Sequence, residues 1–446
     1  MKIIMYAWFI GYYNKEMNAY VRSMASKSGW PERIVFSLSL LHLFVLPWQA
    51  SIPFVDGAQR VGAFLALLLS GAWFALILYR RTVRRPHAFH FAFAVFIGMH
   101  MISVLWTVDM TRTAESILLF AMVGCMVYVY WDLYDNRPTI EFGLQALLLG
   151  IFVAAILVLL VYTTTSDQIL RRGFGFTNFN ATAISRKFVF GLPIAAFLYY
   201  SADQFRSIPW KLINASYLPV GTAAIIVTGS RQAFVLLVVL IIVLWIAFVH
   251  YRKQLYRSYS KTVILTIISA LSIAFATPQI HRFEIFERIL TIRSIVQEGT
   301  LNNRVLIWDA AFDAIGYQPW IGTGSGTFPS VIGSFLIANG HDLDDFLSVI
   351  YPHNIFIGTM AEVGIIGLIA LTAALLIVVR EIIRSNNFLF TGSIILSWFI
   401  LGMVADLHHY MIPWLLLVFL LVIASAPGKT RYWTVKDIKS TVRHLR

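Results

Sequence analysis

Long apolar segments that recur along the chain constrain its fold more than any other feature. Clear examples are residues 61–79, 144–161, 234–249 and 355–379. A helix rises about 1.5 Å per residue, so segments of this length cross, or nearly cross, a hydrocarbon layer of about 30 Å. Only 13% of the 446 residues are charged, whereas roughly a quarter is usual in soluble domains. The sequence therefore predicts an all-α, polytopic membrane protein.

Twelve apolar windows define the predicted spans. They lie near residues 34–50, 61–79, 88–106, 113–130, 142–162, 188–200, 212–228, 232–249, 262–276, 354–379, 388–405 and 410–425. The window 188–200 is the weakest, because it is short and contains Pro193. The predicted organisation is an amino-terminal segment (1–33), nine helices (34–276), a large insert (277–352), three helices (353–425) and a basic tail (426–446).

The distribution of positive charge predicts the orientation of these spans. With both termini in the cytoplasm, 24 of the 35 lysines and arginines lie in inner segments, as the positive-inside rule requires. The net charge of +13 is therefore explained without nucleic-acid binding. The insert then faces outward, into the periplasm of a Gram-negative cell or its equivalent. ATP and nucleotide sugars are absent there, so any chemistry must use an activated substrate, most plausibly on a lipid carrier.

Arginines in outer segments are candidates for anion binding, since a guanidinium group can hold two phosphate oxygens. Arg231 lies in the tight break between two spans, and the alternative is a side chain that snorkels at a helix end. Arg171 and Arg172 precede a loop, 173–180, that is rich in glycine and asparagine. A plain interfacial loop is the alternative there.

The insert contains a predicted amphipathic helix and a glycine-rich turn. Residues 302–315 have helical periodicity with an asparagine cap, and Arg304 shares one face with Trp308, Ala311 and Ile315. Pairing with Asp309 or Asp313 is the alternative to an anion-binding role for Arg304. The turn 320–326 lacks a Walker lysine and a preceding strand, so we interpret it as a flexible or close-packed turn rather than a nucleotide loop.

His353 is the leading candidate for a proton acceptor. Pro352 is suited to the first helical turn, which predicts that His353 lies at the outer end of the tenth span. A helix amino terminus disfavours added positive charge and so lowers the pKa of an imidazole. The alternative is a histidine that is only hydrogen-bonded at an interface.

Metal binding is not predicted. His408 and His409 with Asp406 are partial ligands, but adjacent histidines on a short helical loop are expected to point apart, and no set with zinc spacing is present. Glu362 lies about 13 Å deeper than His353 along one helix, so we expect it to serve packing or a polar cluster. No cofactor is expected.

Taken in order, these motifs resemble the O-antigen ligase and polymerase superfamily. The resemblance rests on Arg231 in Gly-Ser-Arg-Gln-Ala, Arg304 in Asn-Arg-Val-Leu-Ile-Trp, the segment 319–324, the Pro352-His353-Asn354 block and the segment 362–367. The ligase branch is the most similar, because such ligases carry a histidine at the position of His353 and arginines at Arg231 and Arg304.

The resemblance implies a metal-independent enzyme of the multi-span, GT-C-like type. Its donor would be O-antigen polysaccharide on undecaprenyl pyrophosphate, and its acceptor a sugar hydroxyl of lipid A–core oligosaccharide. Arg231 and Arg304, with Arg172 as a third, would stabilise the departing pyrophosphate, and His353 would act as the base. The alternatives are an O-antigen polymerase, an oligosaccharyltransferase acting on protein, and a secondary transporter or flippase. A transporter would place ionisable residues and broken helices in the middle of several spans.

Overall fold

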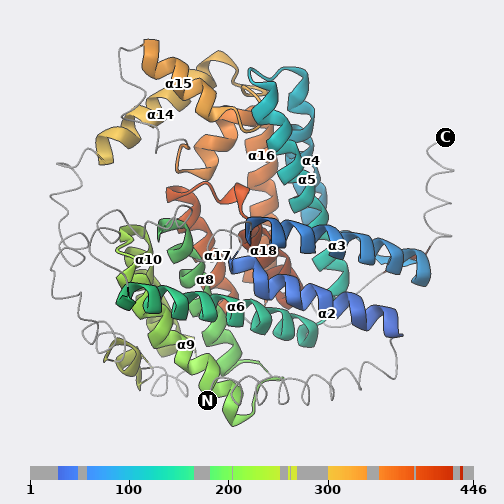
Figure 1. Cartoon of the computed structure of the whole chain (residues 1–446), viewed down its shortest axis with the longest axis vertical. Helices are drawn as coiled ribbons and strands as arrows, with labels where there is room; N and C mark the ends of the chain where they lie inside the picture. The colour runs from blue at the N-terminus through green and yellow to red at the C-terminus, as the bar shows by residue number, and fades with distance from the viewer. Residues whose placement is uncertain are drawn as a thin grey trace.

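The computed structural model describes residues 29–48, 58–164, 181–202, 204–251, 260–261, 263–268, 300–338, 351–385, 388–424 and 432–434. Within them the chain is almost entirely helical (Figure 1). The helices are α2 (Trp30–Val45), α3 (Ala58–Arg80), α4 (Ala88–Ile102), α5 (Met110–Leu133), α6 (Arg137–Thr164), α8 (Ala181–Tyr200), α9 (Ile208–Val227), α10 (Arg231–Tyr251), α14 (Thr300–Tyr317), α15 (Phe328–Ala338), α16 (Ile355–Ile383), α17 (Phe388–Val404) and α18 (Met411–Ala424), with short 3-10 turns η1 (Leu46–Trp48), η2 (Ser103–Leu105) and η5 (Leu407–His409).

Helices occupy the predicted apolar windows that the structure describes. Six segments are long and apolar enough to cross a membrane: Val61–Arg80, Ala88–Leu105, Met110–Leu133, Arg137–Leu160, Ile208–Val227 and Ile355–Ile383. Three shorter apolar helices lie at Arg231–Val243, Phe390–Val404 and Met411–Ala424. A polytopic membrane protein is thus consistent with the structure, whereas the count of twelve spans stays a prediction. Most of the window 262–276 lies outside the described residues.

Helix α8 begins earlier than its apolar window. The window starts at residue 188, but the helix starts at Ala181 and continues through Pro193. Arg186 and Lys187, which the charge count placed in an outer loop, are therefore helical, and both side chains are buried. Hydropathy alone cannot detect the first two turns of α8, because two adjacent cations end an apolar window whether or not the helix continues.

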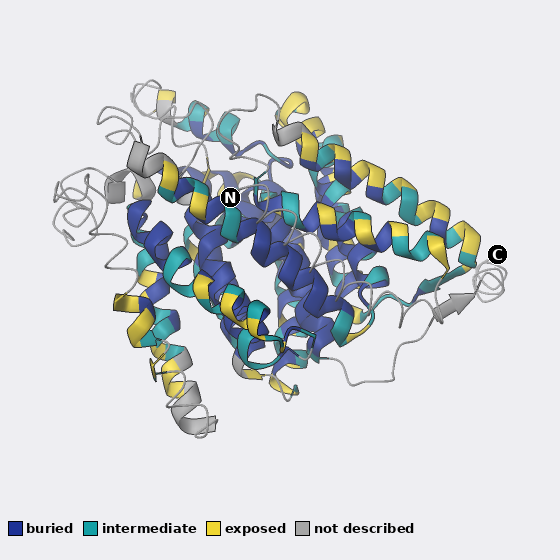
Figure 2. Cartoon of the chain, turned by 60° about the horizontal axis from the view of Figure 1, so that its bottom comes forward, coloured by how far each residue is buried: buried dark blue, intermediate teal, exposed yellow. Residues whose placement is uncertain are grey.

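The surface of several helices is apolar. On α3, the side chains of Phe64, Leu67, Phe74 and Leu78 are each at least 60% exposed, and the burial pattern shows the same outward faces on the peripheral helices (Figure 2). A contiguous apolar surface of this kind is rare on a soluble monomer. Lipid chains are the environment that such helices fit.

Several connections that the sequence predicts to be cytoplasmic lie at one end of the molecule, among them the α3–α4 connection and the segment after α18. The strand β1 (Thr82–Arg84) pairs antiparallel with β2 (Tyr432–Thr434), so the chain after α18 returns to the connection between α3 and α4. At the same end Arg80 forms an ion pair with Asp132. Arg137 and Glu141 form a second ion pair, with 2.9 Å between Nε and Oε1.

The other end carries α14 and α15, which lie beside the ends of α4 and α5 (Figure 1). Ser325, between α14 and α15, joins the two groups: its hydroxyl lies 2.7 Å from His100 Nδ1 and 2.7 Å from the Ser116 hydroxyl. The buried face of α14 packs on α15 and on Ala361 of α16 through Ile307 and its neighbours. The described part of the insert, α14 and α15, therefore forms part of the helical body.

Helix α16 is broken at Gly364, whose φ is +68°. The break leaves backbone groups of α16 without their helical partners, and the glycine-rich segment 319–324 forms hydrogen bonds with them. The Thr323 N–H donates to the Ala361 carbonyl at 3.0 Å, and the Gly324 N–H donates to the Glu362 carbonyl at 2.9 Å. In return, the Ile365 N–H donates to the Pro319 carbonyl at 2.9 Å. Of the two expectations for this segment, a close-packed turn is confirmed.

Candidate active site

His353 lies immediately before α16, not in its first turn. Asn354 caps the helix, since its side-chain oxygen accepts from the N–H groups of Phe356 and Ile357 at 2.9 and 3.2 Å. His353 itself has a φ of +50°, a left-handed conformation that histidine adopts more often than most residues. The prediction that Pro352 starts the helix is therefore wrong, because asparagine satisfies the free N–H groups of a first turn.

Asp406 holds the backbone and the ring of His353. Its Oδ2 accepts the His353 N–H at 3.0 Å and lies 3.7 Å from Nδ1 of the same residue. The ring of His353 stays 31% exposed, so a substrate can reach it. Burial raises the pKa of Asp406 to about 7, opposed by the hydrogen bond from His353 and by the nearby charge of Arg186. These contacts bring α16, α8 and the α17–α18 connection together.

His408 and His409 lie close together beside this pair. Their ring centroids are 4.0 Å apart, and each offers a nitrogen within 4.8 Å of a ligand atom of the other and of Glu362. The expectation that these two histidines point apart is wrong, because the 3-10 turn η5 brings both rings to one side. The expectation that Glu362 belongs to a polar cluster is confirmed, and its Oε2 also accepts the Gly326 N–H at 2.9 Å.

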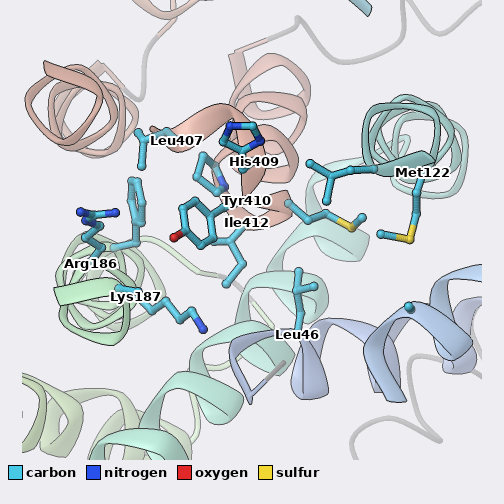
Figure 3. A pocket seen from close by; sticks show the side chains of 14 residues that line it. Leu46, Met122, Arg186, Lys187, Leu407, His409, Tyr410 and Ile412 are labelled. Carbon is cyan, nitrogen blue, oxygen red and sulfur yellow. The ribbon is translucent and has the colours of Figure 1, made fainter. Parts of the chain in front are cut away.

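A cavity of about 440 Å³ opens next to this cluster. Figure 3 shows that Arg186 and Lys187 line it on one side, from α8, while His409, Tyr410 and Ile412 line it from the η5–α18 segment. The Lys187 ammonium donates to the Pro47 carbonyl at 2.8 Å. The remaining wall is largely apolar, with Leu46, Ala63, Leu119, Met122 and Phe190. A cavity of this composition suits a ligand with an anionic head and a hydrocarbon chain.

The predicted helix of the insert is confirmed, but its start differs. Helix α14 begins at Thr300, so the asparagines at 302 and 303 lie inside it and do not cap it. Trp308 donates through Nε1 to the Pro352 carbonyl at 2.9 Å, which ties α14 to the residue before His353. Arg304 lies in the second turn of the same helix, and its side chain is outside the described part.

Arg231 is the first residue of α10 and is partly buried. It follows Gly229, whose φ of +61° makes the tight break between α9 and α10. Helix α10 packs against α8 and α17, the two helices that carry Arg186 and lead to Asp406. Arg171 and Arg172 lie outside the described residues. The roles proposed for the three arginines and for His353 thus remain predictions. Of these residues, the structure places His353 beside Asp406 in a polar cluster.

Sequence reasoning missed Arg186, Lys187 and the partnership of Asp406 with His353. Asp406 is separated from His353 by the whole of α16 and α17, so no local pattern connects them. The adjacent cations Arg186 and Lys187 were visible as a pair at the edge of an apolar window. Extending the predicted helix 188–200 by two turns toward its amino terminus would have placed both cations within that helix.

The family comparison covers the part of this site that contains His353 and Glu362, but not Asp406 or the lining of the cavity. The family model described as O-antigen ligase matches residues 217–372, which include α10, α14, α15, His353 and the break in α16. A comparison with curated proteins gives no match. Residues 217–372 are therefore similar to the O-antigen ligase family, and the order of motifs and the helical fold agree with that similarity.

Proposed function

We propose that this protein is a metal-independent, inverting glycosyltransferase that completes lipopolysaccharide. It would move O-antigen polysaccharide from undecaprenyl pyrophosphate to a sugar hydroxyl of lipid A–core oligosaccharide. The observation that carries the proposal is the partly exposed imidazole of His353, held by buried Asp406, together with a largely apolar cavity that has two cations in its wall. The cavity is adjacent because Leu407, which lines it, directly follows Asp406.

The cavity suits a polyprenyl pyrophosphate in both of its parts. A polyprenyl chain buries hydrocarbon, for which apolar walls provide the driving force. A pyrophosphate needs fixed positive charge, and Arg186 and Lys187 supply two cations at the wall. Its volume lies within the range of roughly 300–1,000 Å³ that is usual for small-molecule sites, so it would hold the head and the first isoprene units.

Transfer would proceed by direct displacement. His353 accepts the proton of the acceptor hydroxyl while that oxygen forms a bond to the anomeric carbon. The bond from this carbon to the pyrophosphate oxygen breaks, and the pyrophosphate leaves with the electron pair. Arg231 and Arg304, with Arg172 as a third, stabilise the charge that develops on it. One displacement inverts the anomeric centre, and no metal ion needs to contact the reacting atoms.

The membrane setting of this proposal is the inner membrane of a Gram-negative bacterium. The site would face the periplasm, with both termini in the cytoplasm. Lysine and arginine counts support that orientation. The pairing of β1 with β2 supports it too, since it brings the carboxyl-terminal segment to a loop of the same predicted side.

The break in α16 bears on the transporter alternative, which expects broken helices. In transporters the unwound backbone lines a cavity and binds the cargo. Here the freed groups of Ala361, Glu362 and Ile365 are instead bonded to segment 319–324. The break therefore anchors the insert to α16, which favours an enzyme over a transporter.

The decisive experiment uses purified protein with lipid-linked O-antigen, lipid A–core and EDTA. Transfer of the polymer to lipid A–core in the presence of EDTA is the expected result. Elongation of a second lipid-linked glycan would identify a polymerase, and transfer to serine or threonine a protein oligosaccharyltransferase. Arg231→Lys keeps the charge but loses the two-oxygen contact, so we expect it to be severely impaired.

A further inference from the structure

Three side chains next to the proposed active site, two buried and one half-buried, form a set to which the transfer mechanism assigns no role. Glu362 comes from α16, and His408 and His409 come from the turn η5. Their ligand atoms lie within 4.8 Å of one another. In tetrahedral zinc with bonds of about 2.0 Å, ligand atoms are roughly 3.3 Å apart. Rotamer adjustments of at most about 1.5 Å would therefore close this set around one ion.

The histidines of this set lack the hydrogen bonds that buried polar groups normally make. Within the described part of the chain, neither ring nitrogen of His408 has a partner, nor does Nε2 of His409. His408 is only 1% exposed, so bulk water does not satisfy it. An orphaned nitrogen of this kind costs about 1–3 kcal/mol, and a bound ion is one way to satisfy several of them in one place.

From this geometry we propose that Glu362, His408 and His409 bind one divalent transition-metal ion of the zinc class. Two imidazoles and one carboxylate are an established zinc set that leaves a fourth position open. Imidazole nitrogen selects such ions over magnesium and calcium, which prefer oxygen ligands. His409 also lines the 440 Å³ cavity, so the set lies beside this cavity (Figure 3).

The ion would join the α17–α18 connection to α16. Both of its histidines follow Asp406 within three residues, and Asp406 is the residue that holds His353. The bound ion thus fixes the support of His353 without contacting it. His409 lines the cavity proposed for the donor, but neither the proposed base nor the arginines assigned to the pyrophosphate supply a ligand. We therefore expect metal binding and metal-independent transfer to be separate properties.

Metal content of the full-length protein tests the proposal. The protein should carry an affinity tag without histidines, be purified without chelator, and be loaded with Zn²⁺ before desalting. We expect about one zinc per chain by mass spectrometry, and visible absorption bands of tetrahedral cobalt after Co²⁺ replaces Zn²⁺. Less than about 0.1 zinc per chain, with no saturable binding below about 10 µM, overturns the proposal.

Ligand variants locate the ion. Glu362→Gln and His409→Gln keep the size of the side chain, and each should weaken zinc binding at least about tenfold. His87→Asn is the matched control, because His87 caps α4 at the other end of the molecule and asparagine can replace it as a cap. Unchanged zinc binding in both ligand variants would exclude the site even if the protein binds zinc elsewhere.

Chelation separates this proposal from the proposed transfer activity. Protein stripped by EDTA should contain no zinc and unfold at a lower Tm, since an ion bound only by the folded state stabilises it, yet it should still transfer glycan. Loss of transfer together with the metal would refute metal independence and leave the site intact. An unchanged Tm after complete removal would refute the role of the ion in joining η5 to α16.

Discussion

The buried carboxylates at the two ends of the molecule differ in how well they are satisfied. At the end with the β1–β2 pair, Asp132 accepts from the Arg84 N–H at 2.7 Å and from Trp73 Nε1 at 2.8 Å, and it pairs with Arg80. Glu141 accepts through both oxygens, from Arg137 and from the Gln204 N–H, at 2.9 Å each. At the opposite end, Oδ1 of Asp406 has no partner among the described residues.

We interpret Asp132 and Glu141, whose oxygens are paired, as residues that stabilise the fold. We interpret Asp406, which has an unpaired oxygen, as a residue that supports the site. Unsatisfied polar atoms and a non-glycine residue at positive φ both cost free energy, and here they occur together in the Asp406–His353 pair. The end with the β1–β2 pair contains closed ion pairs, one between α3 and α5 and one within α6. We therefore expect substitutions at the two ends to have opposite profiles of activity and stability.

The largest effect should follow from His353→Ala. Loss of a general base lowers the rate by about 10²–10⁴-fold. The Tm should fall by only a few degrees, because alanine keeps the backbone N–H that Asp406 accepts and the ring is partly exposed, while the φ of +50° suits alanine less than histidine. Transfer with the purified components and thermal unfolding followed by tryptophan fluorescence measure the two properties. A variant with full transfer activity would remove His353 from the mechanism.

Asp132→Ala should show the reverse profile. Removing one partner of a buried ion pair leaves the other charge uncompensated and costs roughly 3–5 kcal/mol. The variant should therefore unfold at a much lower Tm, while the folded fraction transfers glycan at the normal rate. Glu115→Ala is the control, because Glu115 is exposed and such changes stay within about 0.5 kcal/mol. Equal stability of the two variants would show that the ion pair contributes nothing.

Gly364→Ala tests the junction between the two regions. Its φ of +68° is unfavourable for alanine, and an added Cβ would overlap the Trp320 carbonyl. We expect a loss of roughly 2–4 kcal/mol together with lower activity, because the insert detaches from α16. Gly98→Ala is the matched control: no atom lies within 4 Å of its added Cβ, and alanine should stabilise the helix by about 0.5–1 kcal/mol. A similar gain in Gly364→Ala would mean that the break is not required.

The same contrast explains how much the sequence could predict. Apolar windows located α3, α5, α9 and α16 within a few residues, because hydrophobic length is written locally. The glycine-rich turn and Glu362 were interpreted as structural because the sequence around each of them is informative by itself. The Asp406–His353 pair, the approach of His408 to Glu362, and the burial of Arg186 depend on contacts between helices far apart in sequence. Hydropathy carries no information about them.

The smallest effect tests whether Asp406 supports catalysis or only the fold. The Asp406→Asn variant retains an oxygen for the His353 N–H but loses the negative charge that lies 3.7 Å from His353 Nδ1. A base that is less well oriented lowers kcat, and we expect about a tenfold loss, or about 1.4 kcal/mol, with KM unchanged because the cavity is intact. Glu115→Gln is the control, since Glu115 is exposed and the same loss of charge there should change neither kcat nor KM. A rise in KM with constant kcat would instead place Asp406 in substrate binding, and a fall in Tm alone would reduce it to a structural residue like Asp132.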